Sequence, residues 1–180
     1  MFCHPREDGD PVYNYICLNM NLKKIYETRF INIEERKLIW QVLVTDFFQK
    51  YINKNDIVLD VGCGYGEFIN NIICSKKLAI DLNKSVKKYL NKDIKFFSES
   101  STKMSSIEDK SINKIFVSNF FEHITKEDIV KTIIEFKRVL KSHGEVLILQ
   151  PNIRFCAKDY WMFFDHITAL DDRVLEEVFS

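Results

Sequence analysis

The sequence predicts an α/β fold, built as a doubly wound and mostly parallel Rossmann-like sheet. Short apolar stretches alternate with helical stretches along the chain, which is the pattern of parallel strands joined by crossover helices. A glycine-rich turn, with Gly62, Gly64 and Gly66, follows the first of the apolar strand-like stretches. The 180 residues suit one domain, and an apolar content of 46% is enough for one continuous core.

The N-terminal part of the chain is expected to be helical over residues 22–51, because apolar residues there recur at spacings of three and four. Turn-forming residues 53–56 end this pattern, and the apolar strand 57–61 follows. Continuously apolar strands of this kind are typical of parallel sheets that are covered on both faces.

The remaining elements are expected in alternation. The predicted helices span residues 68–77, 85–91, 125–141 and 173–179, and the predicted strands span 78–80, 94–97, 114–117 and 145–149. His143 and Gly144 are expected to end the helix over 125–141.

Charge and hydropathy exclude several classes of protein. The 26 Lys and Arg residues balance 26 Asp and Glu residues, so the net charge gives no general attraction to nucleic acid or anionic lipid. The apolar runs are far shorter than the roughly 20 residues that span a bilayer. The N-terminus lacks the order of a secretory signal. We therefore expect a cytoplasmic protein with no membrane span and no nucleic-acid partner.

The five cysteines are scattered along the chain without a C-x-x-C pair. Their odd number and wide spacing favour reduced thiols over a disulfide framework or a thiolate zinc site. No metal site is therefore expected.

The glycine-rich turn is the strongest functional signal. Glycines at alternate positions between a strand and a helix let the backbone approach a ligand that any Cβ would push away. Asp81 follows at the next strand end, where a carboxylate can accept both hydroxyls of a ribose. A dinucleotide fold wants its third glycine at the position of Glu67, and the carboxylates of Asp60 and Glu67 would repel a pyrophosphate. They suit a cationic amino acid end instead, and an NAD-dependent oxidoreductase is kept as an alternative.

The stretch 58–66 resembles the cofactor-binding motif of the class I S-adenosylmethionine-dependent methyltransferases. Residues 79–83 are similar to the ribose-binding strand end of that family. Residues 111–124 resemble its fourth strand and following loop, and 138–145 the R-V-L-K-P-G-G segment before its fifth strand. A narrower likeness, over 30–48, 150–155 and 160–166, is to a bacterial subgroup often found near glycan-building enzymes.

The resemblance implies S-adenosylmethionine as the cofactor and S-adenosylhomocysteine as the product. We divide the single domain into an N-terminal helical layer (1–52), a cofactor-binding α/β core (53–151) and a substrate-facing segment with the C-terminal helix (152–180). Ser100 stands where family members often carry an acidic residue for the adenine amino group, so a weaker hydrogen bond is expected there. The residues expected to bind the cofactor are Asp60, Gly62, Cys63, Gly64, Gly66, Asp81, Leu82, Ser100, Ser101 and Asn119.

The acceptor of the methyl group is expected to be a small molecule or a glycan. His123 is the candidate general base for a hydroxyl acceptor, because histidine titrates near neutral pH; the alternative is that it only orders its loop. Tyr160, Trp161 and His166 are candidate substrate contacts, with core packing of this aromatic run as the alternative. The run 118–121 lacks the prolines of N-P-P-Y, which disfavours methylation of exocyclic amines in DNA bases.

The family fold continues after its fifth strand with a helix and an antiparallel pair of strands. The sequence after 149 shows no such pair, so the last two strands are expected to be lacking. The strand 145–149 would then be an apolar edge, open to a second copy or a partner subunit. A catalytically silent cofactor-binding subunit, or a truncated fragment, acting through this edge is the alternative function.

Overall fold

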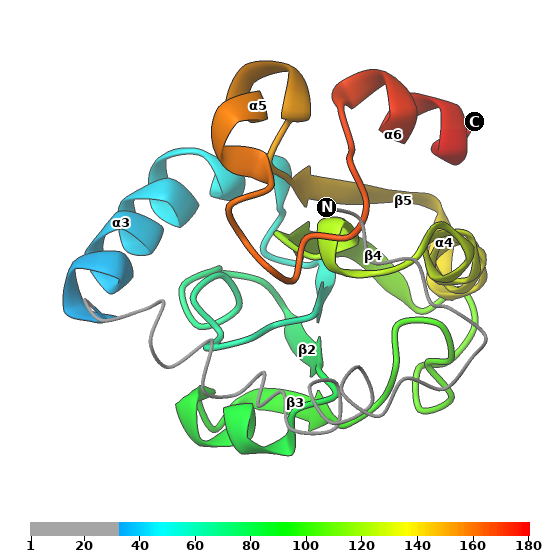
Figure 1. Ribbon diagram of the computed structural model, residues 1–180. Coiled ribbons are helices and arrows are strands. Elements are labelled where there is room, and N and C mark those ends of the chain that lie inside the picture. The colour runs from blue at the N-terminus through cyan, green and yellow to red at the C-terminus, as the bar shows by residue number, and fades with distance from the viewer. Residues whose placement is uncertain (1–32) are drawn as a thin grey trace, which may run out of the picture. The chain divides into compact units, whose positions relative to one another are not determined.

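The computed structural model describes residues 33–180, in which five strands form one sheet (Figure 1). The strands are β1 (Ile57–Val61), β2 (Lys76–Ile80), β3 (Ile94–Phe97), β4 (Ile112–Ser118) and β5 (Leu140–Leu149). Their order is β3-β2-β1-β4-β5, and all neighbours pair in parallel. The predicted doubly wound α/β fold is confirmed.

The register brings the carboxyl ends of the strands to one edge of the sheet. Val61 pairs with Ile80 on one side and with Val117 on the other. The segments that follow β1, β2 and β4 therefore leave the sheet side by side, as expected of ligand-binding edges in open α/β sheets.

One face of the sheet is covered by α4 (Lys126–Val139) and α6 (Asp172–Phe179). The side chains of Thr125 and Asp171 cap these helices by accepting hydrogen bonds from backbone N–H groups in their first turns. The buried apolar face of α4 joins the core cluster of β1 and β4 through Ile129, Ile133, Phe136 and Val139.

The opposite face is covered by α3 (Ile33–Asp46), from Trp40 onward, and by the short 3₁₀ helix η1 (Phe48–Tyr51). The rings of Phe68 and Phe116 stack here with their centroids 3.6 Å apart, and Phe48 meets Phe116 edge to face. The buried aromatic cluster fixes the segment after β1 against the sheet.

Three predicted helices differ from the structure. Residues 68–71 form turns rather than a helix, and Lys76 and Lys77 already belong to β2. The side chains of Asn70 and Asn71 donate to the backbone carbonyls of Tyr89 and Glu67 and compete with helical pairing. The predicted helix 85–91 is the 3₁₀ helix η2 (Lys84–Tyr89). Within the predicted helix 22–51, residues 22–32 lie outside the described part, and the rest is divided between α3 and η1.

The predicted end of α4 at His143 and Gly144 is wrong. The helix ends at Val139, and both residues lie inside β5. The carbonyls of Arg138 and Val139 accept hydrogen bonds from the N–H groups of Lys110 and Ser111, so the chain needs no glycine cap there.

The C-terminal part adds α5 (Ile153–Tyr160) before α6 and contributes no strand. β5 accordingly lies at one edge of the sheet, as predicted. No helix in 33–180 combines the length and the apolar character needed to cross a bilayer. The boundaries at 52 and 151 stay predictions.

Candidate functional site

The turn after β1 is built from backbone in the left-handed region. Gly62, Gly64 and Gly66 have φ values of 69°, 50° and 74°. A Cβ on Gly62 would lie 2.6 Å from the ring of Phe120, and one on Gly66 would collide with Leu90. A Cβ on Gly64 would meet no atom within 4 Å. Packing therefore explains the outer two glycines, whereas Gly64 leaves bare backbone facing open space.

Asp81 is held beside this turn by two backbone groups. Its Oδ2 accepts a hydrogen bond from the Gly64 N–H at 3.0 Å, and its Oδ1 accepts one from the Asn83 N–H at 2.8 Å. Both carboxylate oxygens keep lone pairs for further donors. The next side chain, Leu82, is 74% exposed and offers an apolar surface next to the carboxylate.

A second carboxylate is buried at the base of the turn. Asp60 is only 3% exposed. Burial raises its pKa well above the usual range, and the charges of Glu67 and Asp81 raise it further. Burial also raises the pKa of the neighbouring Cys63 thiol, so this cysteine is not a reactive thiolate. The electrostatics of the turn therefore favour a bound cation.

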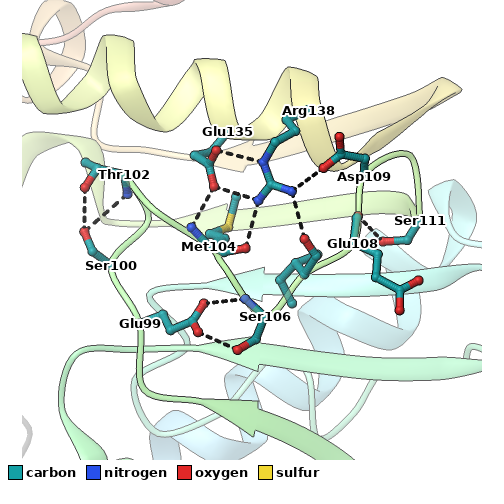
Figure 2. Close-up of polar contacts among 11 residues, drawn as sticks. Glu99, Ser100, Thr102, Met104, Ser106, Glu108, Asp109, Ser111, Glu135 and Arg138 are labelled. Carbon is teal, nitrogen blue, oxygen red and sulfur yellow. Dashed lines mark hydrogen bonds and ion pairs between the residues drawn. The ribbon is translucent and has the colours of Figure 1, made fainter.

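Arg138 of α4 joins the segment after β3 to that helix (Figure 2). Arg138 donates two hydrogen bonds to the Glu135 carboxylate, each of 2.8 Å, and one of 2.6 Å to Asp109. It also donates to the backbone carbonyls of Met104 and Ile107. In the sequence Arg138 is part of a family motif only, because its partners other than Glu135 lie about 30 residues away in the chain.

The two serines at the start of this segment differ. Ser100 is half-buried and shares a 2.8 Å hydrogen bond with the Thr102 hydroxyl (Figure 2). Ser101 is buried, and its hydroxyl pairs with Thr132 on α4. Ser100 thus stands nearer to solvent at the sheet edge, and Ser101 serves the contact with the helix.

The loop after β4 begins with a backbone reversal at Asn119, which has a φ of 46°. Its N–H donates to the Leu149 carbonyl at 2.9 Å, so this loop is tied to the end of β5. The next residue, Phe120, supplies the ring that lies against Gly62. The β1 turn and the β4 loop are therefore packed against each other.

Two residues of this loop, Glu122 and His123, form a cluster of ionisable side chains with His166 from the segment between α5 and α6. Glu122 is fully buried, and its Oε2 accepts a 2.7 Å hydrogen bond from the amide of Gln150. His123 Nδ1 lies 3.0 Å from the backbone carbonyl oxygen of Asp165. Burial holds the pKa of His166 below its ordinary value. Sequence reasoning selected the two histidines separately and missed Glu122, whose position next to His123 was the available signal.

Of the candidate substrate residues, Tyr160 is buried and its hydroxyl donates to the Thr168 carbonyl at 2.6 Å. Burial raises its pKa to about 12. Trp161 is 54% exposed and lies against the Tyr160 ring. Tyr160 thus anchors the segment, whose exposed apolar residues are Phe155, Trp161, Met162, Phe163, Phe164 and Ile167.

The sheet edge therefore combines a bare backbone turn, a fixed carboxylate and a surplus of negative charge. Such an edge can hold a ligand with a cationic group and a pair of hydroxyls.

Comparison with known proteins gives one matching family model and several similar proteins. Residues 59–148 match the family model described as a methyltransferase domain. A protein of Methanocaldococcus jannaschii, the uncharacterised MJ1252, is 28% identical over 153 residues, which are 83% of this chain and 55% of that protein. The chain thus spans about half the length of this curated relative.

Solved structures share the fold. The SAM-dependent methyltransferase of Archaeoglobus fulgidus superposes with a TM-score of 0.71 at 20% identity, over 88% of this chain and 72% of that one. A Haloferax volcanii methyltransferase, solved in complex with the Trm112 methyltransferase activator, gives 0.67 at 15% identity, over 81% and 68%.

Proposed function

Because the chain belongs to the methyltransferase-domain family, we propose that it is an S-adenosylmethionine-dependent methyltransferase that acts on a small-molecule or glycan-type acceptor. The observation that carries the proposal is the pairing of bare backbone at Gly64 with the anchored carboxylate of Asp81. S-adenosylhomocysteine is the product that this reaction leaves.

The residues at the sheet edge fit this cofactor. The open space above Gly64 admits a ligand against the backbone, and Asp81 has free lone pairs for a ribose diol. Ser100 would accept from an adenine amino group, and Leu82 would contact its ring. The full set that would hold the cofactor is Asp60, Gly62, Cys63, Gly64, Gly66, Asp81, Leu82, Ser100, Ser101 and Asn119.

Charge supports this cofactor over a dinucleotide. S-adenosylmethionine carries a sulfonium and an ammonium, and the carboxylates of Asp60, Glu67 and Asp81 attract both. The pyrophosphate of NAD would meet repulsion from the same three groups. An NAD-dependent oxidoreductase is therefore not favoured.

The cofactor, when bound, supplies an electrophilic methyl group on a good neutral leaving group. The work left to the chain is to hold an acceptor in line, and orientation of this kind is worth several kcal/mol. We assign it to the exposed aromatic surface around Trp161. His123 keeps its predicted role as general base; its Nδ1–H donates to Asp165, which leaves Nε2 as the basic atom.

The first test is calorimetry with S-adenosylmethionine, S-adenosylhomocysteine and NAD. The first two are expected to bind and NAD is not; binding of NAD alone would refute the proposal. Replacing Asp81 by alanine should weaken S-adenosylmethionine binding by about 1.5–3 kcal/mol, the range for a charged hydrogen bond. Asp93→Ala is the matched control, because Asp93 is exposed at the far end of β3 and should leave the affinity unchanged.

The second test is a labelled-methyl assay against cell extract. Transfer of label to an extract component supports enzymatic activity. Tight cofactor binding without any transfer would favour the silent binding subunit instead.

We also propose that a second copy or a partner subunit pairs with β5, because this strand lies at the edge of the sheet. Light scattering tests this, and a monomer at all concentrations would refute self-association.

We also propose a cytoplasmic location, which is in keeping with reduced cysteines.

A further inference from the structure

The buried carboxylate of Glu122 lacks a hydrogen bond on one of its oxygens. Among residues 33–180, its Oε1 has no donor within hydrogen-bonding distance, although the side chain is fully buried. The nearest basic atoms are His123 Nε2 at 3.7 Å and His166 Nε2 at 4.0 Å. A buried anionic oxygen in this state is costly unless a cation compensates it.

The Nε2 atoms of both imidazoles are the ring nitrogens nearest to this oxygen. His123 Nδ1 lies 3.0 Å from the Asp165 carbonyl oxygen and 3.3 Å from the Asp165 carboxylate, so the other ring nitrogen, Nε2, is the one turned towards Glu122. A metal ion between Nε2 and Oε1 would compensate the buried carboxylate. A hydrogen bond from a histidine's other nitrogen to a carbonyl is the usual orientation of metal-bound histidine.

From this arrangement we propose that Glu122, His123 and His166 bind a divalent transition-metal ion, with Zn²⁺ as the best chemical match. One carboxylate and two imidazoles are a known ligand set of catalytic zinc, and they leave a coordination position open.

The three ligand atoms lie about 1 Å farther apart than they would around a bound zinc. One donor atom from each of the three side chains lies within 4.8 Å of the other two. Ligands at about 2.0–2.2 Å from a tetrahedral zinc are about 3.3–3.6 Å apart. A movement of the histidine nitrogens by about 1 Å would bring the three ligand atoms to these distances.

The supporting contacts hold the ligands together from segments distant in the chain. The Glu122 carbonyl accepts hydrogen bonds from the N–H groups of Ile167 and Thr168, at 2.8 and 3.1 Å. These bonds bring His166 to the loop after β4. Gln150 orients the Glu122 carboxylate through a 2.7 Å bond to Oε2. Outer contacts of this kind fix metal ligands in position.

The metal site lies in the loop after β4, at the edge that carries the cofactor turn. An open coordination position would bind a water or an acceptor hydroxyl and lower its pKa. The metal would then take over the activation role predicted for His123, whose Nε2 is used as a ligand. This consequence rests on the proposed function, whereas metal binding itself does not.

Zinc titration of the chelator-treated protein tests the site. We expect one Zn²⁺ per chain at this cluster, and a loss of affinity of at least 100-fold in Glu122→Gln, His123→Ala and His166→Ala. His143→Ala is the matched control, because His143 is exposed on β5, and it should bind as the unmodified protein does. Absence of zinc binding, or equal binding by the cluster variants, overturns the proposal. A protonated imidazole would then be the group that compensates the buried Glu122 carboxylate.

Two further readouts keep the test decisive if a variant fails to fold. The Co²⁺ form of the unmodified protein should show ligand-field bands without thiolate charge transfer; a thiolate band would move the site to cysteines and refute the assignment. S-adenosylmethionine binding should persist in the folded variants. Loss of metal with intact cofactor binding separates this proposal from the proposed function.

Discussion

The turn after β1 and the loop after β4 lie side by side at the sheet edge, but the turn exposes backbone and the loop carries ionisable side chains. The turn presents backbone, because Gly64 places no side chain in the open space above it. The loop presents side chains, because Glu122 and His123 are buried or half-buried and meet His166 from another segment. Under the proposed function, this contrast would divide one sheet edge into a turn that binds the cofactor and a loop that serves the acceptor.

The largest expected effect comes from adding one methyl group at two glycines. Gly64→Ala should weaken S-adenosylmethionine binding by about 100-fold, equal to about 2.7 kcal/mol, because the Cβ enters the ligand's space. Gly62→Ala should instead destabilise the fold by about 1–3 kcal/mol, because its Cβ meets Phe120. Calorimetry and thermal melting measure the two effects. Unchanged S-adenosylmethionine binding by Gly64→Ala would contradict the different roles of the two glycines.

Arg138→Ala should loosen the segment after β3. It removes the bonds to Glu135 and Asp109 and leaves the carbonyls of Met104 and Ile107 without their donor. We expect a loss of about 2–3 kcal/mol in the free energy of unfolding, or about 5–10 °C in Tm. Cofactor affinity should fall as well, because Ser100 lies on this segment.

The control for that variant is Arg173→Ala, since Arg173 pairs with Asp171 while its side chain is 69% exposed. Its effect should be much smaller, because solvent screens an exposed ion pair. Equal losses in the two variants would show that Arg138 has no special role in fastening the segment.

A smaller effect is expected from Asp60→Asn, and it should depend on pH. The folded-state pKa of Asp60 is raised, so the folded protein binds this proton more tightly than the unfolded chain does. Stability from this group is therefore present at low pH and is lost as pH rises through the folded pKa. Asp60→Asn should melt higher than the unmodified protein at pH 8, with little difference near the unfolded-state pKa of Asp, and should bind the cofactor more weakly. A Tm difference that is constant with pH would contradict the buried charge.

The part of the site that sequence could predict is the part that is local in the chain. Gly62, Gly64 and Gly66 lie within five residues, and Asp81 follows one strand later. The strand pattern likewise predicted the parallel sheet, since continuously apolar strands need cover on both faces.

Other features depend on contacts that no local pattern records. The apolar spacing over 68–77 is helical, yet Asn70 and Asn71 bond distant or neighbouring carbonyls and hold turns instead. The cluster of Glu122 with His166 needs backbone bonds across more than 40 residues. The partners of Arg138 outside α4, such as Asp109, are similarly remote, and only the fold brings them together.

The most direct test of the central claim is a crystal structure with S-adenosylhomocysteine. The account predicts the adenosyl group over the bare backbone at Gly64, with both ribose hydroxyls donating to the Asp81 carboxylate. Ligand bound elsewhere, or a ribose that makes no contact with Asp81, would contradict it.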